Sequence, residues 1–101
     1  MARIVFTASA SADQAAILTE IHFKAGALTA AKFRSRFSVL HDRLSDYPES
    51  GAPRPALGPG VRIGIVPPYI IIYRRAAEDD TVVVLRVVHG RRQIVSRLLT
   101  E

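Results

Sequence analysis

The chain has no cysteine among its 101 residues, which excludes disulfide bonds and a thiolate nucleophile. Long hydrophobic runs are missing as well. The longest nearly apolar stretch, Ile63–Tyr73, is about half of what a membrane-spanning helix needs, and Pro67-Pro68 interrupts it. The N-terminus, Met1–Phe6, turns polar too early for the apolar region of a signal peptide. These absences predict a cytoplasmic protein without a membrane span.

Familiar catalytic motifs are also absent. His22, His41 and His89 fall on three different predicted elements, and no pair of carboxylates has the spacing of a catalytic or metal site. The chain contains no phosphate-binding glycine loop and no dinucleotide fingerprint. We therefore expect neither a metal nor a cofactor. We interpret His22 and His41 as solvent-facing helix residues. His89 follows a strand, where either a structural hydrogen bond or general acid–base chemistry would suit it.

Positive charge is in excess. Fourteen Lys and Arg residues against nine Asp and Glu residues give a net charge of +5, and arginine supplies most of it. Because the planar arginine fork matches carboxylate and phosphate groups, this excess points to an acidic protein partner or to nucleic acid. The alternative is that the charge only keeps a small protein soluble, and composition leaves both interpretations open.

The order of apolar segments predicts one domain over residues 1–101, and 49% hydrophobic content suffices for one core. Arg3–Thr7 alternates as a strand does, and two helices follow it. The first ends near Ala25, where Gly26 stops it, and the second begins at Thr29 as N-cap. The candidate N-caps of the first helix are Ser9, Ser11 and Asp13. The second helix carries one narrow apolar stripe, formed by Phe33, Phe37, Leu40, Leu44 and Tyr47.

Three β runs follow the loop Glu49–Pro59, and they span Val61–Val66, Tyr69–Arg75 and Thr81–Val88. The chain is therefore predicted to be α+β, with a helical hairpin on one face of a mainly antiparallel four-stranded sheet and a short C-terminal helix or tail. The second and third β runs are apolar at nearly every position, which favours strands covered on both faces. The second face needs either the C-terminal segment Gln93–Leu99 or another chain as its cover.

Two groups of basic residues and one aromatic residue are candidates for binding. Lys32, Arg36 and Arg43 share one stripe of the second helix, which is either a solvated flank or a binding surface. Phe23 lies opposite the apolar stripe of the first helix, either as an exposed anchor or packed under the tail. The C-terminal group has no acid between positions 81 and 100, and such clustering favours a partner. Its members are Arg86, His89, Arg91, Arg92 and Arg97.

Three motifs follow one another in the chain: G-x-R at Gly60–Arg62, Y-x-I-x-Y at Tyr69–Tyr73 and R-V-x-H-G-R-R at Arg86–Arg92. Their order resembles that of the RelE/ParE family of bacterial toxins. The resemblance covers nearly the whole chain, and it is carried by P-x-x-G at Pro48–Gly51, Leu57, Gly60, Arg62, Tyr69, Tyr73 and Val87–Arg92. It implies the toxin of a type II toxin–antitoxin module, neutralised by an acidic antitoxin whose C-terminal segment wraps it, and it allows a heterotetramer of the two. Under this resemblance the antitoxin contacts are Phe23, Lys32, Arg36, Arg43 and Arg62, and the target contacts are Arg86, His89, Arg91 and Arg92.

The family has two branches with different activities. RelE-like toxins cut messenger RNA on the ribosome without metal, and they use basic residues together with a tyrosine, or a histidine–tyrosine pair, near the C-terminus. Here Ile70 stands where RelE-type sequences carry an arginine, no tyrosine follows position 73, and only His89 and Arg92 match such roles. The sequence is closer to the ParE-like, plasmid-stabilisation branch, which inhibits DNA gyrase by binding it and has no catalytic residues of its own. The alternatives are a metal-independent endoribonuclease and a non-toxic module that binds nucleic acid or has a regulatory role.

Overall fold

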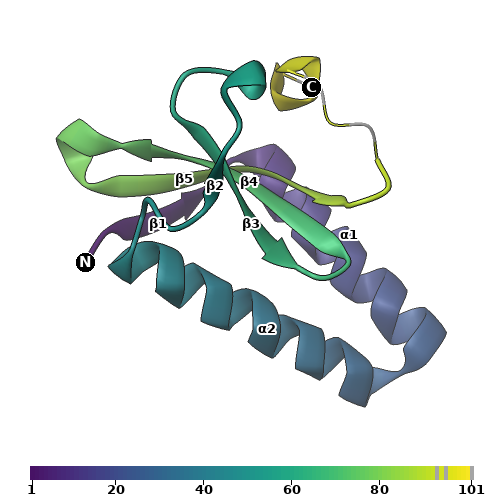
Figure 1. The fold of residues 1–101 in the computed structure, drawn as a ribbon. Coiled ribbons are helices and arrows are strands. Elements are labelled where there is room, and N and C mark those ends of the chain that lie inside the picture. The colour runs from purple at the N-terminus through teal and green to yellow at the C-terminus, as the bar shows by residue number, and fades with distance from the viewer. Residues whose placement is uncertain (93, 95, 101) are drawn as a thin grey trace.

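The computed structural model describes residues 1–92, 94 and 96–100, and it places two helices on one face of a sheet (Figure 1). The first strand, β1 (Arg3–Phe6), leads directly into α1 (Ala8–Ala25), and α2 (Ala27–Asp46) returns antiparallel to it. The helical hairpin and the N-terminal strand confirm the expected α+β class. Neither helix is long and apolar enough to cross a membrane, among the residues that the model describes.

The helices begin earlier than the sequence predicted. Thr7 is the N-cap of α1, since its hydroxyl accepts a hydrogen bond from the Ala10 N–H at 3.0 Å. The predicted caps at positions 9, 11 and 13 therefore lie inside the helix. Gly26, at φ 91°, lies between α1 and α2, so Thr29 is within α2 and caps nothing. The chain leaves β1 at Phe6 and enters α1 at Ala8, so Thr7 occupies the N-cap position in place of the three predicted residues.

The sheet has five strands in the order β1-β5-β4-β3-β2. The three long strands match the predicted runs, and their bounds are β3 (Val61–Val66), β4 (Tyr69–Ala76) and β5 (Thr81–His89). They pair antiparallel, and β1 pairs parallel to β5. The expectation of four strands is wrong because β2 (Ala52–Pro53), within the predicted loop, pairs with β3. A two-residue strand containing proline has no sequence pattern to reveal it.

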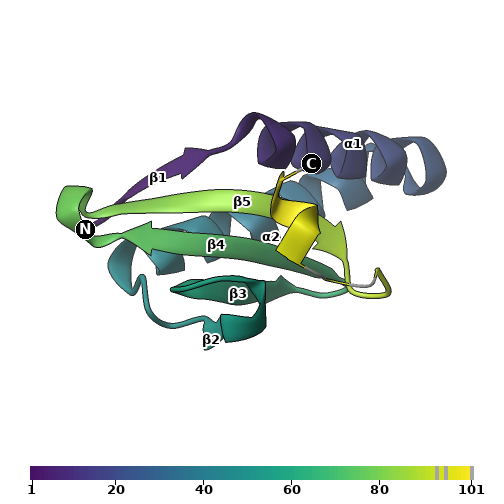
Figure 2. The same cartoon turned by 90° about the horizontal axis from the view of Figure 1, so that it is seen from above.

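Each face of the sheet has its own hydrophobic core. The core under the helices includes Phe37, Leu40, Leu44, Ile71, Tyr73, Val82 and Val84. The opposite face is covered by two short 3₁₀ helices, Pro55–Leu57 and Ser96–Thr100 (Figure 2). There Leu57 and Leu98 pack with Val61, Ile63, Ile72 and Val88. The chain therefore covers the second face itself, as one of the two alternatives expected, while Gln93 and Val95 lie outside the described residues.

A β-bulge in β5 decides which of its side chains meet the helices. Ile72 lies opposite Arg86 while Tyr73 lies opposite Val84, so Leu85 is the extra residue. The hydroxyl of Thr7 donates to the Leu85 carbonyl at 2.9 Å and links the bulge to the start of α1. After the bulge the alternation resumes one residue out of step. The shift places Arg86 beside Ile72 on the face opposite the helical core, and it turns Val87 toward the core under the helices.

Candidate functional site

Arg86 was expected at the rim of the sheet, and that placement is wrong. Its side chain is 8% exposed and forms a forked ion pair with Asp13 of α1, at 2.6 Å from Nε and 3.0 Å from Nη2. Asp13 also accepts the backbone N–H of Val87, while Nη1 of Arg86 donates to the Leu98 carbonyl at 2.9 Å. Arg86 thus joins α1, β5 and the C-terminal 3₁₀ helix. The tertiary fold brings Asp13 to it from far along the chain.

The turn after β5 places the other members of the C-terminal basic group. The N–H of Gly90 donates to the Pro68 carbonyl at 2.7 Å, and the N–H of Arg92 donates to the His89 carbonyl at 2.9 Å. The ring nitrogen Nδ1 of His89 accepts the N–H of Arg91 at 3.0 Å. These bonds fix a tight turn on which the side chains of Arg91 and Arg92 are exposed. We call Arg91 and Arg92 the arginine rim.

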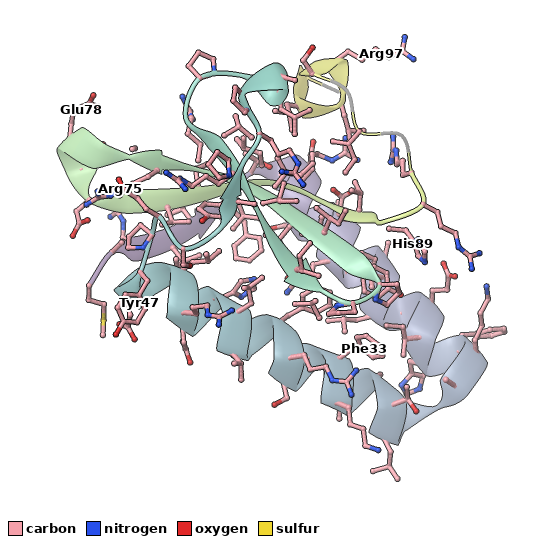
Figure 3. All side chains as sticks on the ribbon, viewed as in Figure 1. Phe33, Tyr47, Arg75, Glu78, His89 and Arg97 are labelled. Atoms are coloured by element: carbon pink, nitrogen blue, oxygen red, sulfur yellow. The ribbon has the colours of Figure 1, made fainter. Side chains whose placement is uncertain are left out.

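Arg97 does not join the arginine rim. It is exposed on the C-terminal 3₁₀ helix, which covers the sheet face opposite the helices, whereas His89 lies at the end of β5 (Figure 3). Of the five C-terminal basic residues, the structure therefore brings together His89, Arg91 and Arg92. Arg86 and Arg97 are separated from them by burial and by the fold.

Beside the arginine rim lies a crevice of about 320 Å³ between α1 and the ends of β4 and β5. Its polar lining includes His89 and Arg92, which the sequence predicted as site residues, and Glu20 and Tyr69, which the sequence did not assign to a site. The Tyr69 ring stands edge-on to the His89 ring, with 5.7 Å between centroids. Burial raises the pKa of the Tyr69 hydroxyl, and the Glu20 carboxylate raises it further. We call this space the α1–β5 crevice.

A second hollow, of about 280 Å³, lies between α2 and the edge strand β3. Arg36 and Arg43 flank it, and Val39 and Ile65 are 66% and 52% exposed beside it. The guanidinium of Arg36 also lies 4.9 Å above the centre of the Phe33 ring, a cation–π contact that orients it. Two members of the predicted helix stripe therefore border an apolar groove, which we call the α2–β3 groove. Lys32 is exposed on the same helix but does not line it.

Arg62, a predicted antitoxin contact, is half-buried and makes hydrogen bonds within the chain. Its Nη1 donates to the carbonyl oxygens of Glu49 at 3.0 Å and Gly51 at 2.9 Å. The Gly51 N–H in turn donates to the Tyr73 hydroxyl at 2.9 Å, and a Cβ on Gly51 would collide with that hydroxyl. Burial raises the pKa of Tyr73. These residues of the shared motif hold the segment after α2 against the sheet.

Phe23 is 89% exposed near the turn that joins the two helices, which projects beyond the sheet (Figure 1). Of the two alternatives left by the sequence, exposure is therefore correct, and no part of the tail that the structure describes covers this side chain. His22 is exposed, as expected. His41 was wrongly assigned to the solvent side, because it packs its ring edge-on against Phe6 at 4.9 Å between centroids.

Comparisons with known proteins agree with this geometry. The family model described as ParE toxin of type II toxin-antitoxin system, parDE, matches residues 4–94. A curated relative, Toxin ParE3 of Caulobacter vibrioides, is 32% identical over 98 residues, which are 97% of this chain and 96% of the relative. A solved chain of the chromosomal ParDE system of P. aeruginosa has a TM-score of 0.72 at 25% identity, over 88% of this chain and 96% of that one. A chain of the RelBE2 toxin–antitoxin complex from Mycobacterium tuberculosis has a TM-score of 0.54 at 27% identity, over 87% and 96%.

Proposed function

Because the chain belongs to the ParE family of toxins of type II toxin–antitoxin systems, we propose that it arrests growth by binding DNA gyrase and that an acidic antitoxin neutralises it. The family and the near-complete coverage of its relative support the toxin class. The gyrase target is inferred from the ParE-like pattern of the sequence. The observation that supports binding is the arginine rim.

The arginine rim is suited to a protein interface. Arg91 and Arg92 are exposed on a turn that three hydrogen bonds hold in place, so little backbone entropy is lost when a partner binds. Arginine forks bind carboxylates with two parallel hydrogen bonds and often carry a large share of interface energy. A rigid pair of exposed arginines therefore fits an acidic site on a target protein.

A second candidate, ribosome-dependent cleavage of messenger RNA, is favoured by one observation. Tyr69 and Glu20 line the same crevice as His89 and Arg92. They supply a carboxylate and the phenol that the C-terminal tail lacks. RNA cleavage needs one group to activate the 2′-hydroxyl and another to protonate the leaving oxygen, and His89 would have to serve as one of them.

The two candidates are separated by assaying gyrase supercoiling and message cleavage on ribosomes with the same proteins. Replacing both rim residues, Arg91→Ala with Arg92→Ala, should abolish growth arrest and gyrase inhibition while the circular dichroism spectrum stays unchanged. Arg3→Ala with Arg74→Ala removes the same charge from exposed positions outside the rim and should leave both intact. His89→Ala should weaken gyrase inhibition only slightly, because no proton transfer depends on it. Cleavage of messages by the parent protein, lost by about 10²–10⁴-fold in His89→Ala, would instead establish the ribonuclease.

For the antitoxin, we propose the α2–β3 groove as the main contact. The Val61 carbonyl accepts a hydrogen bond from the Arg54 N–H, so the backbone groups of Val61 face the β2 side of β3. Every second residue of such a strand faces the same edge, and the N–H and C=O of Ile65 therefore face the β2 side as well. β2 reaches only as far as the pairing of Ala52 with Ile63, which leaves the edge at Ile65 open among the described residues. An extended segment could add there as a strand. Its aliphatic side chains would cover Val39 and Ile65, and its carboxylates would meet Arg36 and Arg43.

Phe23 and Lys32 lie outside this groove but on the same helical hairpin. We propose them as secondary antitoxin contacts, because an antitoxin segment that continues along the hairpin would reach both. Phe23 offers a large exposed apolar surface at the hairpin turn, and Lys32 offers a charge on the exposed side of α2.

A further inference from the structure

The α1–β5 crevice brings together groups of different chemistry, of which only Arg92 also belongs to the arginine rim. His89 and Arg92 line the crevice beside the Tyr69 ring, which lies opposite His89 in the pairing of β4 with β5, and Glu20 is close enough to the Tyr69 hydroxyl for its carboxylate to shift the pKa of that hydroxyl. The rest of the lining is apolar at Ala16, Ile17, Val87 and Val88, and it includes Asp13, whose carboxylate is paired with Arg86. A ligand that fills the crevice needs an anionic end, a flat apolar body and an edge of hydrogen-bond donors.

His89 and Arg92 supply hydrogen-bond donors, and the turn after β5 fixes their positions. Because Nδ1 of His89 accepts the Arg91 N–H at 3.0 Å, the neutral imidazole carries its proton on Nε2 and can donate from there. The guanidinium of Arg92 only donates, and the backbone bond from Arg92 to the His89 carbonyl holds the two residues in one turn. Donors of this kind bind phosphate oxygens with short, charge-assisted hydrogen bonds.

Glu20 offers a carboxylate that can accept hydrogen bonds from a ligand. Glu20 accepts from Lys24 at 2.9 Å, but both side chains of this pair are well exposed, at 65% and 72%. An exposed ion pair between neighbouring turns of a helix contributes little to stability, so exchanging it for a ligand costs little. Two carboxylate oxygens match two adjacent N–H donors, such as those on the Watson–Crick edge of guanine, and the Tyr69 ring offers an aromatic surface nearby.

We propose that the α1–β5 crevice binds one nucleotide, with its phosphate at His89 and Arg92 and its base at Glu20 and Tyr69, and that guanine is preferred. The nucleotide belongs either to a DNA or RNA strand or to the free pool, since the recognised chemistry is the same. This inference requires neither gyrase nor an antitoxin. It concerns binding, and no bond is made or broken.

The test is a titration of the free chain, followed by NMR at the His89 and Tyr69 side chains. The probes are deoxyguanosine monophosphate, guanosine monophosphate, thymidine monophosphate, inorganic phosphate, and short DNA and RNA strands that contain one guanine. Both guanine nucleotides should shift the His89 and Tyr69 signals and bind about tenfold or more tightly than thymidine monophosphate and inorganic phosphate. If a strand is the source, one of the two strands should bind more tightly than the corresponding mononucleotide.

Variants separate base recognition from simple charge attraction. Glu20→Gln should remove the preference for guanine while keeping the weak phosphate affinity, because the amide replaces one acceptor by a donor. Glu78→Gln, which makes the same change at an exposed position in the turn before β5, should leave the preference unchanged. Replacing His89 and Arg92 together by Ala should abolish nucleotide binding.

Three results would overturn the proposal: no binding at millimolar nucleotide, equal affinity for guanine and thymine nucleotides, or shifts confined to residues outside the crevice. Failure here would leave gyrase inhibition untouched, and a negative gyrase assay would leave nucleotide binding untouched. The two proposals are therefore tested independently.

Discussion

Arg86 and Arg92 stand close together in an arginine-rich stretch, but burial gives them different roles. Arg86 donates two hydrogen bonds to Asp13 and one to the Leu98 carbonyl, counted among the residues that the structure describes. A buried charge needs such partners, and deleting one of them costs far more than the pair contributes in net stability. An Arg86 substitution would therefore test folding rather than target binding. Arg92 is exposed in the turn after β5, so its substitution tests binding rather than folding.

His41 provides a pH-dependent prediction at the residue scale. Burial lowers its pKa below the ordinary value of 6.5, and the nearby Asp42 carboxylate opposes part of this shift. Its Nε2 is also buried without a hydrogen-bond partner among the described residues, so a proton added there has no acceptor. The unfolded chain takes up a proton as the pH falls through 6.5, whereas the folded chain takes it up only at lower pH. The free energy of unfolding should therefore be largest above pH 6.5 and fall as the pH drops toward the folded pKa.

Urea denaturation at about pH 7.5 and about pH 5.5 measures this change, in a window above most carboxylate titration. His41→Gln should flatten the dependence, because the titrating group is gone. His22→Gln is the matched control, since His22 is exposed on α1, and it should retain the parent slope. Equal slopes for the parent and His41→Gln would show that another group dominates.

At the scale of elements, the contact between α2 and the sheet determines stability. Phe37 and Leu44 are at most 1% exposed in the core beneath the helices, and Leu40 lies so close to Gly64 of β3 that a Cβ there would be 3.0 Å from its side chain. The spacing of these residues in the sequence predicted this stripe correctly, because a helix repeats every 3.6 residues. Tyr47 is the exception, since α2 ends at Asp46 and the Tyr47 side chain is exposed.

Phe37→Ala should lower the free energy of unfolding by about 3–5 kcal/mol, because it removes apolar contact and leaves a cavity that a packed core refills poorly. The control is Val39→Ala on the same helix. Val39 is 66% exposed, so its truncation should change stability by about 0.5 kcal/mol or less. Chemical denaturation of the three proteins measures both differences. A Phe37→Ala midpoint close to that of the parent would contradict the assignment of this core.

In the sheet, the sequence predicted the strands but not which of their faces lies against the helices. The apolar runs predicted β4 and β5, but a strand that is apolar at every position does not reveal which side chains face the helices. In the fold Ile71 and Tyr73 face them, while Ile72 packs on the opposite face. The bulge at Leu85 then reverses the alternation within β5. Such a bulge depends on hydrogen bonds from Thr7, which lies at the other end of the chain.

At the scale of the whole molecule, charge and groove together yield a prediction for the antitoxin. The net charge of +5 should attract an acidic partner, and Arg36 and Arg43 flank the apolar α2–β3 groove. Arg36→Gln with Arg43→Gln should weaken binding of the proposed acidic antitoxin by roughly 3–30-fold and reduce its dependence on salt. Arg3→Gln with Arg74→Gln makes the same change in net charge outside the groove.

Calorimetric titration at low and high salt compares the two double variants with the parent. A groove contact predicts a large loss for Arg36 and Arg43 and a small one for Arg3 and Arg74. Equal losses in both would mean that only the net charge matters, and the α2–β3 groove would then not be the antitoxin site.

The sequence by itself determined the α+β class, the helical hairpin, the three long strands and the family, because these follow from local periodicity and from motifs read in order. It also placed His89, Arg91 and Arg92 after a strand, since that placement is local. Only the tertiary structure decided which groups meet: Asp13 with Arg86, and Glu20 and Tyr69 with His89 and Arg92. These contacts join residues far apart in the chain, and no spacing rule reaches across a helix, a loop and three strands. The tertiary structure also decided that Arg86, which the sequence placed among the exposed basic residues, is buried and paired with Asp13.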